Sequence, residues 1–330
     1  MDVVTGATGF VGPHLVDALV ARGRRVRCLV RDIARASFLE RAGVEVREGS
    51  LLDDRFVADA LQGAERVFHL AGGGKVSTAS QEGLDLLRRS NVAPLETVLR
   101  GATGARVQRV VHFSSISSMG VQLDVRLDES SPCKPETPHE IAKFESERVA
   151  LDAYRRDGTP VVVLRPSQIY GPGDVRSEIP RLVRLTRRGL VPMFGGGEGL
   201  MPWVFVSDVV DAAMAAAERP EAPGQTYIVS DSESYRFADI VASIARALGR
   251  KRGGLAIPRT LAWPAIAAVE MGAKALGREP PFTRHRLASM CGRRLVSIAH
   301  ARLDLGYVPR VGLDEGMQRA VTWCVARGLA

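Results

Sequence analysis

The chain has 330 residues, of which 45% are apolar and 25% are charged, as in an ordinary globular protein. Its 45 basic and 37 acidic side chains leave a formal net charge of +8, and the arginines behind this excess are scattered along the sequence. Nucleic-acid-binding proteins concentrate such charge on one face, so we expect no nucleic-acid partner. The positive charge instead favours an anionic cofactor or substrate.

The cysteines and the apolar runs restrict the class further. None of the 4 cysteines forms a CxxC pair, and no histidine or cysteine spacing indicates a metal site. The apolar run TLAWPAIAAV (260–269) contains a proline and is too short to span a bilayer. With no signal peptide in the sequence, we expect a reduced, cytoplasmic protein without an integral membrane segment or a bound metal.

The first thirty residues predict a strand, a glycine-rich turn, a helix and a second strand. The apolar pair Val3–Val4 precedes Gly6, Gly9 and Gly12, and an apolar helical period leads to RRVRCLVRD (24–32). A glycine triplet between a strand and a helix lets the backbone approach a pyrophosphate, which the helix N-terminus then binds. This context predicts a dinucleotide-binding βαβ unit.

The end of the second strand indicates which dinucleotide is bound. An acidic residue there would bind the ribose 2′-hydroxyl of NAD, but the strand ends in Arg31, with Asp32 one place later. An arginine suits the 2′-phosphate, so NADP is favoured over NAD. The alternative is that Asp32 caps the next segment and Arg31 is only solvated.

Further motifs follow in chain order, and together they cover nearly the whole sequence. They are VREGSLLDD (46–54), RVFHLAGG (66–73), SNVAPLETVL (90–99), RVVHFSSISSMG (109–120), VVVLRPSQIYGPGD (161–174) and GGGEGLMPWVFVSDVVDA (195–212). With the glycine turn, they resemble the extended short-chain dehydrogenase/reductase family, within the NAD-dependent epimerase/dehydratase superfamily. The segments GREPPFTRHRL (277–287) and SIAHARLDLGYVPRVGLDEGMQRAVTW (297–323) are similar to its 3β-hydroxysteroid dehydrogenase-like branch.

This resemblance implies an α/β fold with a doubly wound parallel sheet (Rossmann) and a smaller, mainly helical C-terminal substrate lobe. The cofactor domain is expected to take residues 1–165 plus about 203–229, and the substrate lobe about 170–200 plus 230–330. Helices of the kind at 91–101 and 139–155 form a dimer bundle in this family, so we expect a homodimer.

The family works through a serine, a tyrosine and a lysine, the last two spaced YxxxK on a helix. Ser115 matches the serine that would hydrogen-bond the substrate oxygen, and Lys143 matches the lysine that would hold the nicotinamide ribose. The tyrosine position is His139, which the i, i+4 spacing puts on the helix face of Lys143. An imidazole can exchange protons near neutral pH, but it is shorter than tyrosine, and a charged Lys143 disfavours the imidazolium.

The family match also assigns the surroundings of these residues. The cofactor contacts that it implies, besides Lys143, are Gly6, Thr8, Gly9, Phe10, Val11, Gly12, Arg31, Ser50, Leu51, Leu70, Ala71, Gly72, Ser114, Pro166, Ser167 and Ile169. Tyr170 and Met119 are candidate substrate contacts.

Three functions stay open. The first is an NADP-dependent oxidoreductase that interconverts a ketone and a secondary alcohol, with His139 as the general acid/base. The second is an epimerase, isomerase, dehydratase or cyclase that retains the cofactor, and the third is a redox-silent NADP-binding protein. The apolar segment GLAIPRTLAWPAIAAVEMGAKALG (254–277) favours a hydrophobic steroid-, polyketide- or acyl-like substrate, unless it only packs the core of its lobe.

Overall fold

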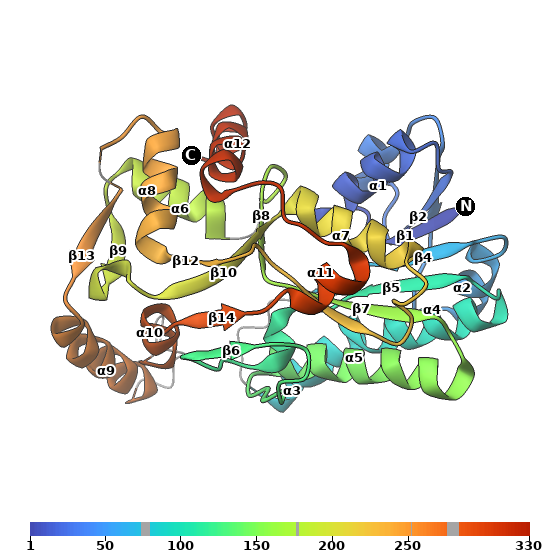
Figure 1. Ribbon diagram of the computed structural model, residues 1–330, viewed down its shortest axis with the longest axis horizontal. Coiled ribbons are helices and arrows are strands. Elements are labelled where there is room, and N and C mark those ends of the chain that lie inside the picture. Colours follow the sequence, from blue (N-terminus) through green and yellow to red (C-terminus); the bar gives the residue numbers. More distant parts are fainter. Residues whose placement is uncertain (74–79, 176–177, 252, 276–283) are drawn as a thin grey trace.

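Seven parallel strands form the central sheet of the larger lobe (Figure 1). The computed structural model describes the chain apart from residues 74–79, 176–177, 252 and 276–283. In sheet order the strands are β11 (Thr226–Val229), β7 (Val161–Pro166), β5 (Arg109–Phe113), β4 (Arg66–His69), β1 (Asp2–Thr5), β2 (Val26–Val30) and β3 (Val44–Glu48). Valines and other apolar residues fill both faces of the inner strands, as expected for a buried parallel sheet. The chain order reverses beside β1, which opens a crevice at the carboxyl ends of β1 and β4.

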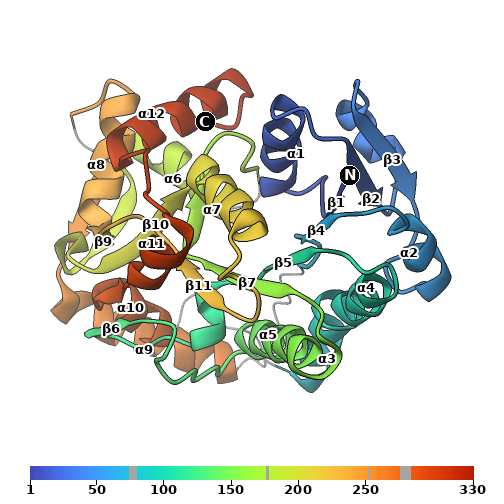
Figure 2. The same cartoon turned by 45° about the vertical axis from the view of Figure 1, so that its right-hand side comes forward.

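Helices cover both faces of this sheet (Figure 2). One face carries α1 (Val11–Ala21), α7 (Val206–Glu218) and α11 (Ala299–Leu305). The other carries α2 (Asp54–Ala60), α3 (Gln81–Asn91), α4 (Ala93–Gly104) and α5 (Pro138–Asp157). The predicted doubly wound α/β fold is therefore confirmed.

The smaller lobe combines helices with three short sheets. Its helices are α6 (Glu178–Arg187), α8 (Phe237–Ala247), α9 (Arg259–Ala275), α10 (Arg284–Cys291) and α12 (Leu313–Ala326). The sheets are β8 (Gln168–Tyr170) with β10 (Leu200–Phe205) and β12 (Ser234–Arg236), β9 (Val191–Phe194) with β13 (Gly254–Ile257), and β6 (Val125–Leu127) with β14 (Arg294–Val296). Short 3₁₀ turns lie at Ala34–Leu39, Ile116–Met119 and Gly195–Gly197. The sequence analysis expected this lobe to be mainly helical and did not predict its short sheets, and the exact domain division remains a prediction.

Strand β6 ties the two lobes together. It lies in sequence between β5 and α5, yet it pairs in parallel with β14, which comes about 170 residues later. Val125 faces Arg294 in this pairing, and the Asp124 N–H donates to the Arg293 carbonyl at 2.8 Å. The start of β14 is therefore fixed against a segment that leaves the main sheet beside Ser115.

The apolar segment 260–269 forms most of α9, with Pro264 inside the helix. Ala262 and Ile266 pack with Leu287, whereas Leu261 is exposed. One side of α9 therefore packs a small core, and no α9 residue belongs to the described lining of the large cavity below. Among the described helices, none is long and apolar enough to cross a membrane. The segment 277–287 lies largely outside the described residues.

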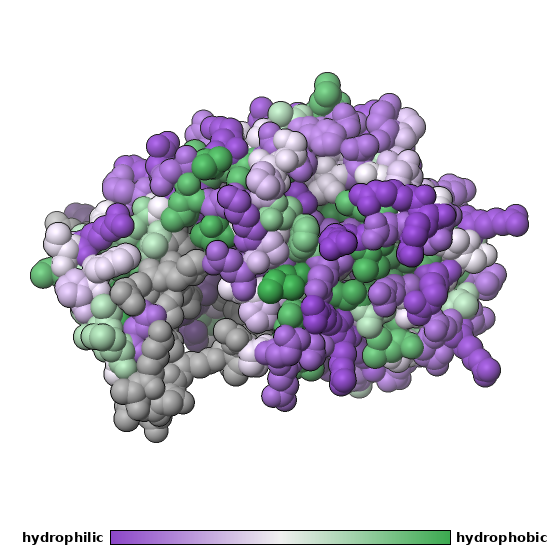
Figure 3. Space-filling view, turned by 90° about the horizontal axis from the view of Figure 1, so that it is seen from below, coloured by the Kyte–Doolittle hydropathy of each residue, from purple (hydrophilic) through white to green (hydrophobic). Residues whose placement is uncertain are grey.

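Seen from below, the surface of the larger lobe is mostly hydrophilic, with its apolar residues in small separate groups (Figure 3). A scattered distribution of this kind is normal for a protein surface.

Candidate active site

The glycine-rich turn lies between β1 and α1. A Cβ at Gly12 would lie 2.6 Å from the Ala7 Cα, and one at Gly6 would lie 2.7 Å from the Ala71 nitrogen. A Cβ at the exposed Gly9 would approach only the Gly6 carbonyl oxygen, at 3.1 Å. Phe10 caps α1 without a side-chain hydrogen bond, so the first N–H groups of the helix are left for a ligand. This turn fits a dinucleotide pyrophosphate.

Arg31 and Asp32 follow β2 at the same edge of the sheet, and both are exposed. The Asp32 carboxylate accepts a hydrogen bond from the Ala34 N–H at 3.0 Å. Asp32 therefore caps the next turn, as the alternative interpretation of the sequence supposed. Arg31 has no hydrogen bond or ion pair with the described part of the chain.

The other predicted cofactor contacts of this half, Ser50, Leu51, Leu70, Ala71 and Gly72, follow β3 and β4. Parallel strands bring them to the edge that carries the glycine turn. The buried Asn91, which the sequence analysis missed, accepts a hydrogen bond from the Gly73 N–H at 3.1 Å and so fixes the loop after β4.

Ser115 begins the turn that follows β5. Its hydroxyl lies 2.6 Å from that of Ser117, and both side chains line a cavity between the lobes. The Lys143 ammonium donates to the Phe113 carbonyl at 3.2 Å, at the end of the same strand. Burial lowers the pKa of Lys143 to about 8, and the charge of Glu147 opposes this shift. The structure thus brings the predicted serine and lysine to one strand end.

The residues around His139 start helix α5. Thr137 and Glu140 form a reciprocal capping box, with Pro138 in the first turn. His139 is exposed and is not among the described cavity-lining residues, whereas Glu140 is buried and lines the cavity. Nearby protein atoms and then the Lys143 charge lower the pKa of His139, and Glu140 opposes them. His139 is therefore neutral near pH 7, and its catalytic role remains a prediction.

A buried polar cluster lies behind this site. The Ser114 hydroxyl donates to the Glu147 carboxylate at 2.6 Å, and Arg165 pairs with Glu147 at 2.7 Å. Ser114, a predicted cofactor contact, therefore already uses its hydroxyl within the protein. The cluster fixes α5 against β5 and β7.

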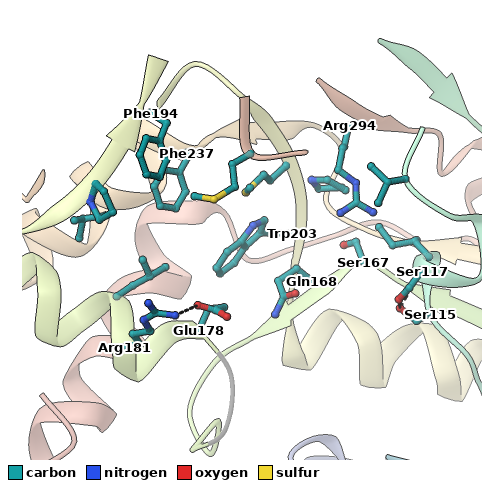
Figure 4. Close-up of a pocket in the computed structure, with 18 of the residues that line it drawn as sticks. Ser115, Ser117, Ser167, Gln168, Glu178, Arg181, Phe194, Trp203, Phe237 and Arg294 are labelled. Carbon is teal, nitrogen blue, oxygen red and sulfur yellow. Dashed lines mark hydrogen bonds and ion pairs between the residues drawn. The ribbon is translucent and has the colours of Figure 1, made fainter. Parts of the chain in front are cut away.

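The cavity between the lobes has a volume of about 390 Å³ (Figure 4). Its polar end carries Ser115, Ser117, Ser167 and Arg294, and its other end is largely apolar. The apolar lining consists of Ile116, Val121, Leu182, Leu185, Val191, Pro192, Phe194, Met201, Pro202, Trp203, Phe237 and Met290. A mainly apolar pocket with a few convergent polar groups is typical of a small-molecule site.

Five further predicted contacts are Pro166, Ser167, Ile169 and Tyr170, which end or follow β7, and Met119, which follows β5. Ser167 is buried, and its hydroxyl has no partner among the described residues, so it is free to bind a ligand. Pro166 ends β7 beside it, and Ile169 packs against the core clusters of both lobes. Tyr170 and Met119 are buried in the core and do not appear in the described cavity lining.

The sequence analysis missed Arg294, Trp203 and Glu140 as cavity residues. Glu140 could have been predicted from the sequence, because it directly follows the predicted site residue His139 at the start of the helix. Trp203 and Arg294 come from distant strands, so no local pattern marked them. Among the described residues, no group of three or more histidine, cysteine, aspartate or glutamate side chains could hold a metal.

Residues 3–230 match the model of the NAD dependent epimerase/dehydratase family. The chain belongs to this family. It is 30% identical to 3beta-hydroxysteroid-dehydrogenase/decarboxylase isoform 1 of Arabidopsis thaliana, covering 97% of this chain and 78% of the relative. It is 32% identical to Sterol demethylase protein B of Methylococcus capsulatus, covering 99% of each chain.

A solved structure supports the same assignment. MoeE5 in complex with UDP-glucose and NAD is 26% identical, has a TM-score of 0.77, and matches 100% of this chain and 99% of its own. The family match and the relatives named as dehydrogenases or reductases make this chain an enzyme of the oxidoreductase type with a nucleotide cofactor.

Proposed function

We propose that this enzyme uses NADP to interconvert a ketone and a secondary alcohol on a small, largely apolar substrate. The observation that supports this most directly is the position of Ser115. Its hydroxyl lines the polar end of a cavity whose remaining wall is aromatic and aliphatic. A carbonyl oxygen bound at Ser115 would leave the body of the substrate against the apolar wall.

Each polar residue has a distinct role in this proposal. Ser115 donates a hydrogen bond to the substrate oxygen, and Lys143 binds the nicotinamide ribose. When bound, the cofactor supplies or accepts the hydride. His139 exchanges the proton with the substrate oxygen through a water molecule, since its exposed ring lies outside the described cavity lining.

The preference for NADP rests on Arg31. Asp32 is engaged in capping, and the exposed Arg31 guanidinium has no partner among the described residues, so it is free for a 2′-phosphate. The name of the MoeE5 structure records NAD for that relative, so this preference is proposed for this chain from its own residue.

Hydride transfer tests the proposal. The purified enzyme is incubated with NADPH deuterated at the transferable position and with a panel of methyl ketones, steroid ketones and 3-oxoesters. Deuterium in the product alcohol would support a ketone reductase. If no member of the panel causes the enzyme to oxidise NADPH, the result would count against the ketone reductase.

The position of His139 favours a second candidate, a redox-neutral epimerase, isomerase, dehydratase or cyclase. A residue outside the described cavity lining is a poor direct proton donor for a ketone. Product formation without net change of the cofactor would identify this second function. Tight NADP binding without any product would leave a redox-silent binding protein.

We also propose a homodimer through the exposed sides of α4 and α5, which pack side by side (Figure 2). Light scattering on a gel-filtered sample gives the mass directly. A mass near 35.6 kDa, that of one chain, would exclude the dimer.

A further inference from the structure

The guanidinium of Arg294 is placed in the cavity without a protein partner. It makes no hydrogen bond or ion pair with the described residues, and Figure 4 shows its side chain pointing into the cavity towards Ser167. Its backbone is held from two sides, by the β6–β14 pairing and by the Leu200 N–H, which donates to the Gly292 carbonyl at 3.0 Å. The position of Arg294 is therefore fixed by the fold.

Half-burial makes this arrangement costly unless an anion completes it. Loss of solvent lowers the pKa of Arg294, but a guanidinium keeps its proton at neutral pH. The nearby Glu140 carboxylate forms no ion pair with it, and its Oε2 accepts hydrogen bonds from the Glu136 and Thr137 N–H groups at 2.9 and 3.0 Å. A half-buried charge that lacks an ion-pair partner in the free protein is expected where a ligand supplies one.

We propose that Arg294 binds a carboxylate on the substrate, at the same end of the cavity as the reacting oxygen held by Ser115. The apolar part of the substrate then lies against Phe194, Trp203 and Phe237. The substrate class is an amphiphilic oxo or hydroxy acid with one negative charge. This inference rests on the proposed function, because it uses the same cavity and the same serine.

The charges of the cavity favour a carboxylate over a diphosphate. The second arginine of the described lining, Arg181, pairs with Glu178 at 3.9 Å at the other end of the cavity (Figure 4). A diphosphate carries more charge than a single guanidinium neutralises, and the Glu140 carboxylate would repel it. A planar carboxylate matches the fork of one arginine.

Two probes of equal chain length, decanoate and 1-decanol, test the inference by calorimetric titration of the protein in excess NADP. We expect decanoate to bind at least about 10-fold more tightly than 1-decanol. Arg294→Met should weaken decanoate binding by about 10- to 100-fold and leave 1-decanol binding unchanged. Compared with Arg294→Met, Arg294→Lys should restore part of the preference for decanoate, since lysine keeps the positive charge but lacks the two parallel N–H donors of a guanidinium.

Arg293→Met is the matched control, because it removes the same charge from an exposed neighbour. Equal binding of the two probes, no decanoate binding, or the same loss in both variants would overturn the inference. Titration requires no turnover, so the two proposals can fail separately. If the protein prefers decanoate over 1-decanol and this preference depends on Arg294, but no hydride is transferred to any ketone, only the ketone reductase proposal is rejected. If hydride is transferred but the protein does not prefer decanoate over 1-decanol, only the carboxylate site is rejected.

Discussion

The Glu147 carboxylate and the Arg165 guanidinium form a buried ion pair at 2.7 Å, with side chains only 2% and 7% exposed. The pair joins α5 to β7, and Lys143 lies one turn before Glu147 on the helix. The orientation of the helix that carries Lys143 and His139 thus depends on a charge pair that does not touch the cavity.

Glu147→Gln should lower the free energy of unfolding by about 3–5 kcal/mol, because it leaves Arg165 buried without its counter-ion. Chemical denaturation measures the loss. Glu145→Gln on the same helix is the control: its partner Arg88 is 40% exposed, so the cost should be about 1 kcal/mol or less. Equal losses of unfolding free energy in the two variants would show that the buried ion pair stabilises the fold no more than the exposed one does.

Lys143→Met should make the cofactor-free protein more stable at neutral pH. The pKa of Lys143 is about 8 in the folded protein and 10.5 when unperturbed, so burial of its ammonium costs about 3 kcal/mol. Loss of the hydrogen bond to the Phe113 carbonyl and of the attraction to the Glu147 charge reduces the expected gain to about 1–3 kcal/mol.

The pH dependence of this gain has a fixed sign. The folded protein binds fewer protons than the unfolded chain between about pH 8 and 10.5, so the parent gains stability as the pH rises through this window. The advantage of Lys143→Met should therefore shrink above pH 8. The exposed Lys134→Met should change stability by no more than about 0.5 kcal/mol at any pH. A constant difference between parent and Lys143→Met would contradict the assigned shift.

Arg31→Ala should remove most of the preference for NADPH over NADH, because the 2′-phosphate loses its charged partner. Fluorescence titration with NADPH and with NADH measures the ratio of the two affinities. Arg25 precedes β2 and is exposed at the opposite end of the strand, so Arg25→Ala should keep the preference. An unmodified enzyme that binds both cofactors equally would rule out the role given to Arg31.

Gly9→Val should abolish cofactor binding with the fold retained, and Gly12→Val should destabilise the fold itself. A Cβ at Gly9 would meet only one carbonyl oxygen, at 3.1 Å, whereas one at Gly12 would lie 2.6 Å from two backbone atoms. Thermal unfolding and cofactor titration, applied to both variants, separate the two effects. Normal titration by Gly9→Val would mean that the turn does not bind the pyrophosphate.

His139→Ala should lower the rate of ketone reduction by about 10²–10⁴-fold with little change in NADPH affinity. The lowered pKa of His139 predicts that reduction by the parent becomes faster as the pH falls below the usual histidine range, where imidazolium forms. This ionisation should be absent from the pH profile of the variant. His139→Tyr should keep or raise activity if the site is that of a reductase. An alanine variant as active as the parent would make His139 a bystander.

The sequence predicted the features that depend on neighbouring residues. The glycine turn is one, because Gly6, Gly9 and Gly12 act within one strand–turn–helix unit. The start of α5 is another: a helix was expected over 139–155, and the residues that cap its start, Thr137 and Glu140, lie within four residues of one another.

Two cavity residues, Trp203 and Arg294, owe their positions to contacts between distant segments, which no local sequence pattern indicates. Both enter the cavity from strands that pair only with distant segments. Tyr170 was expected to contact the substrate, but Trp203 and Phe205 pack against its ring in the core. Its predicted contact with the substrate therefore stays a prediction.

The pairing of β6 with β14 limits how this enzyme can be recombined with its relatives. A chimera that exchanged everything after residue 230 would combine a β14 from one parent with a β6 from the other. The register that aligns Val125 with Arg294 would then be set by two sequences that never evolved together. A library that aims at new substrates should therefore exchange residues 121–136 together with the C-terminal segment, as one discontinuous block.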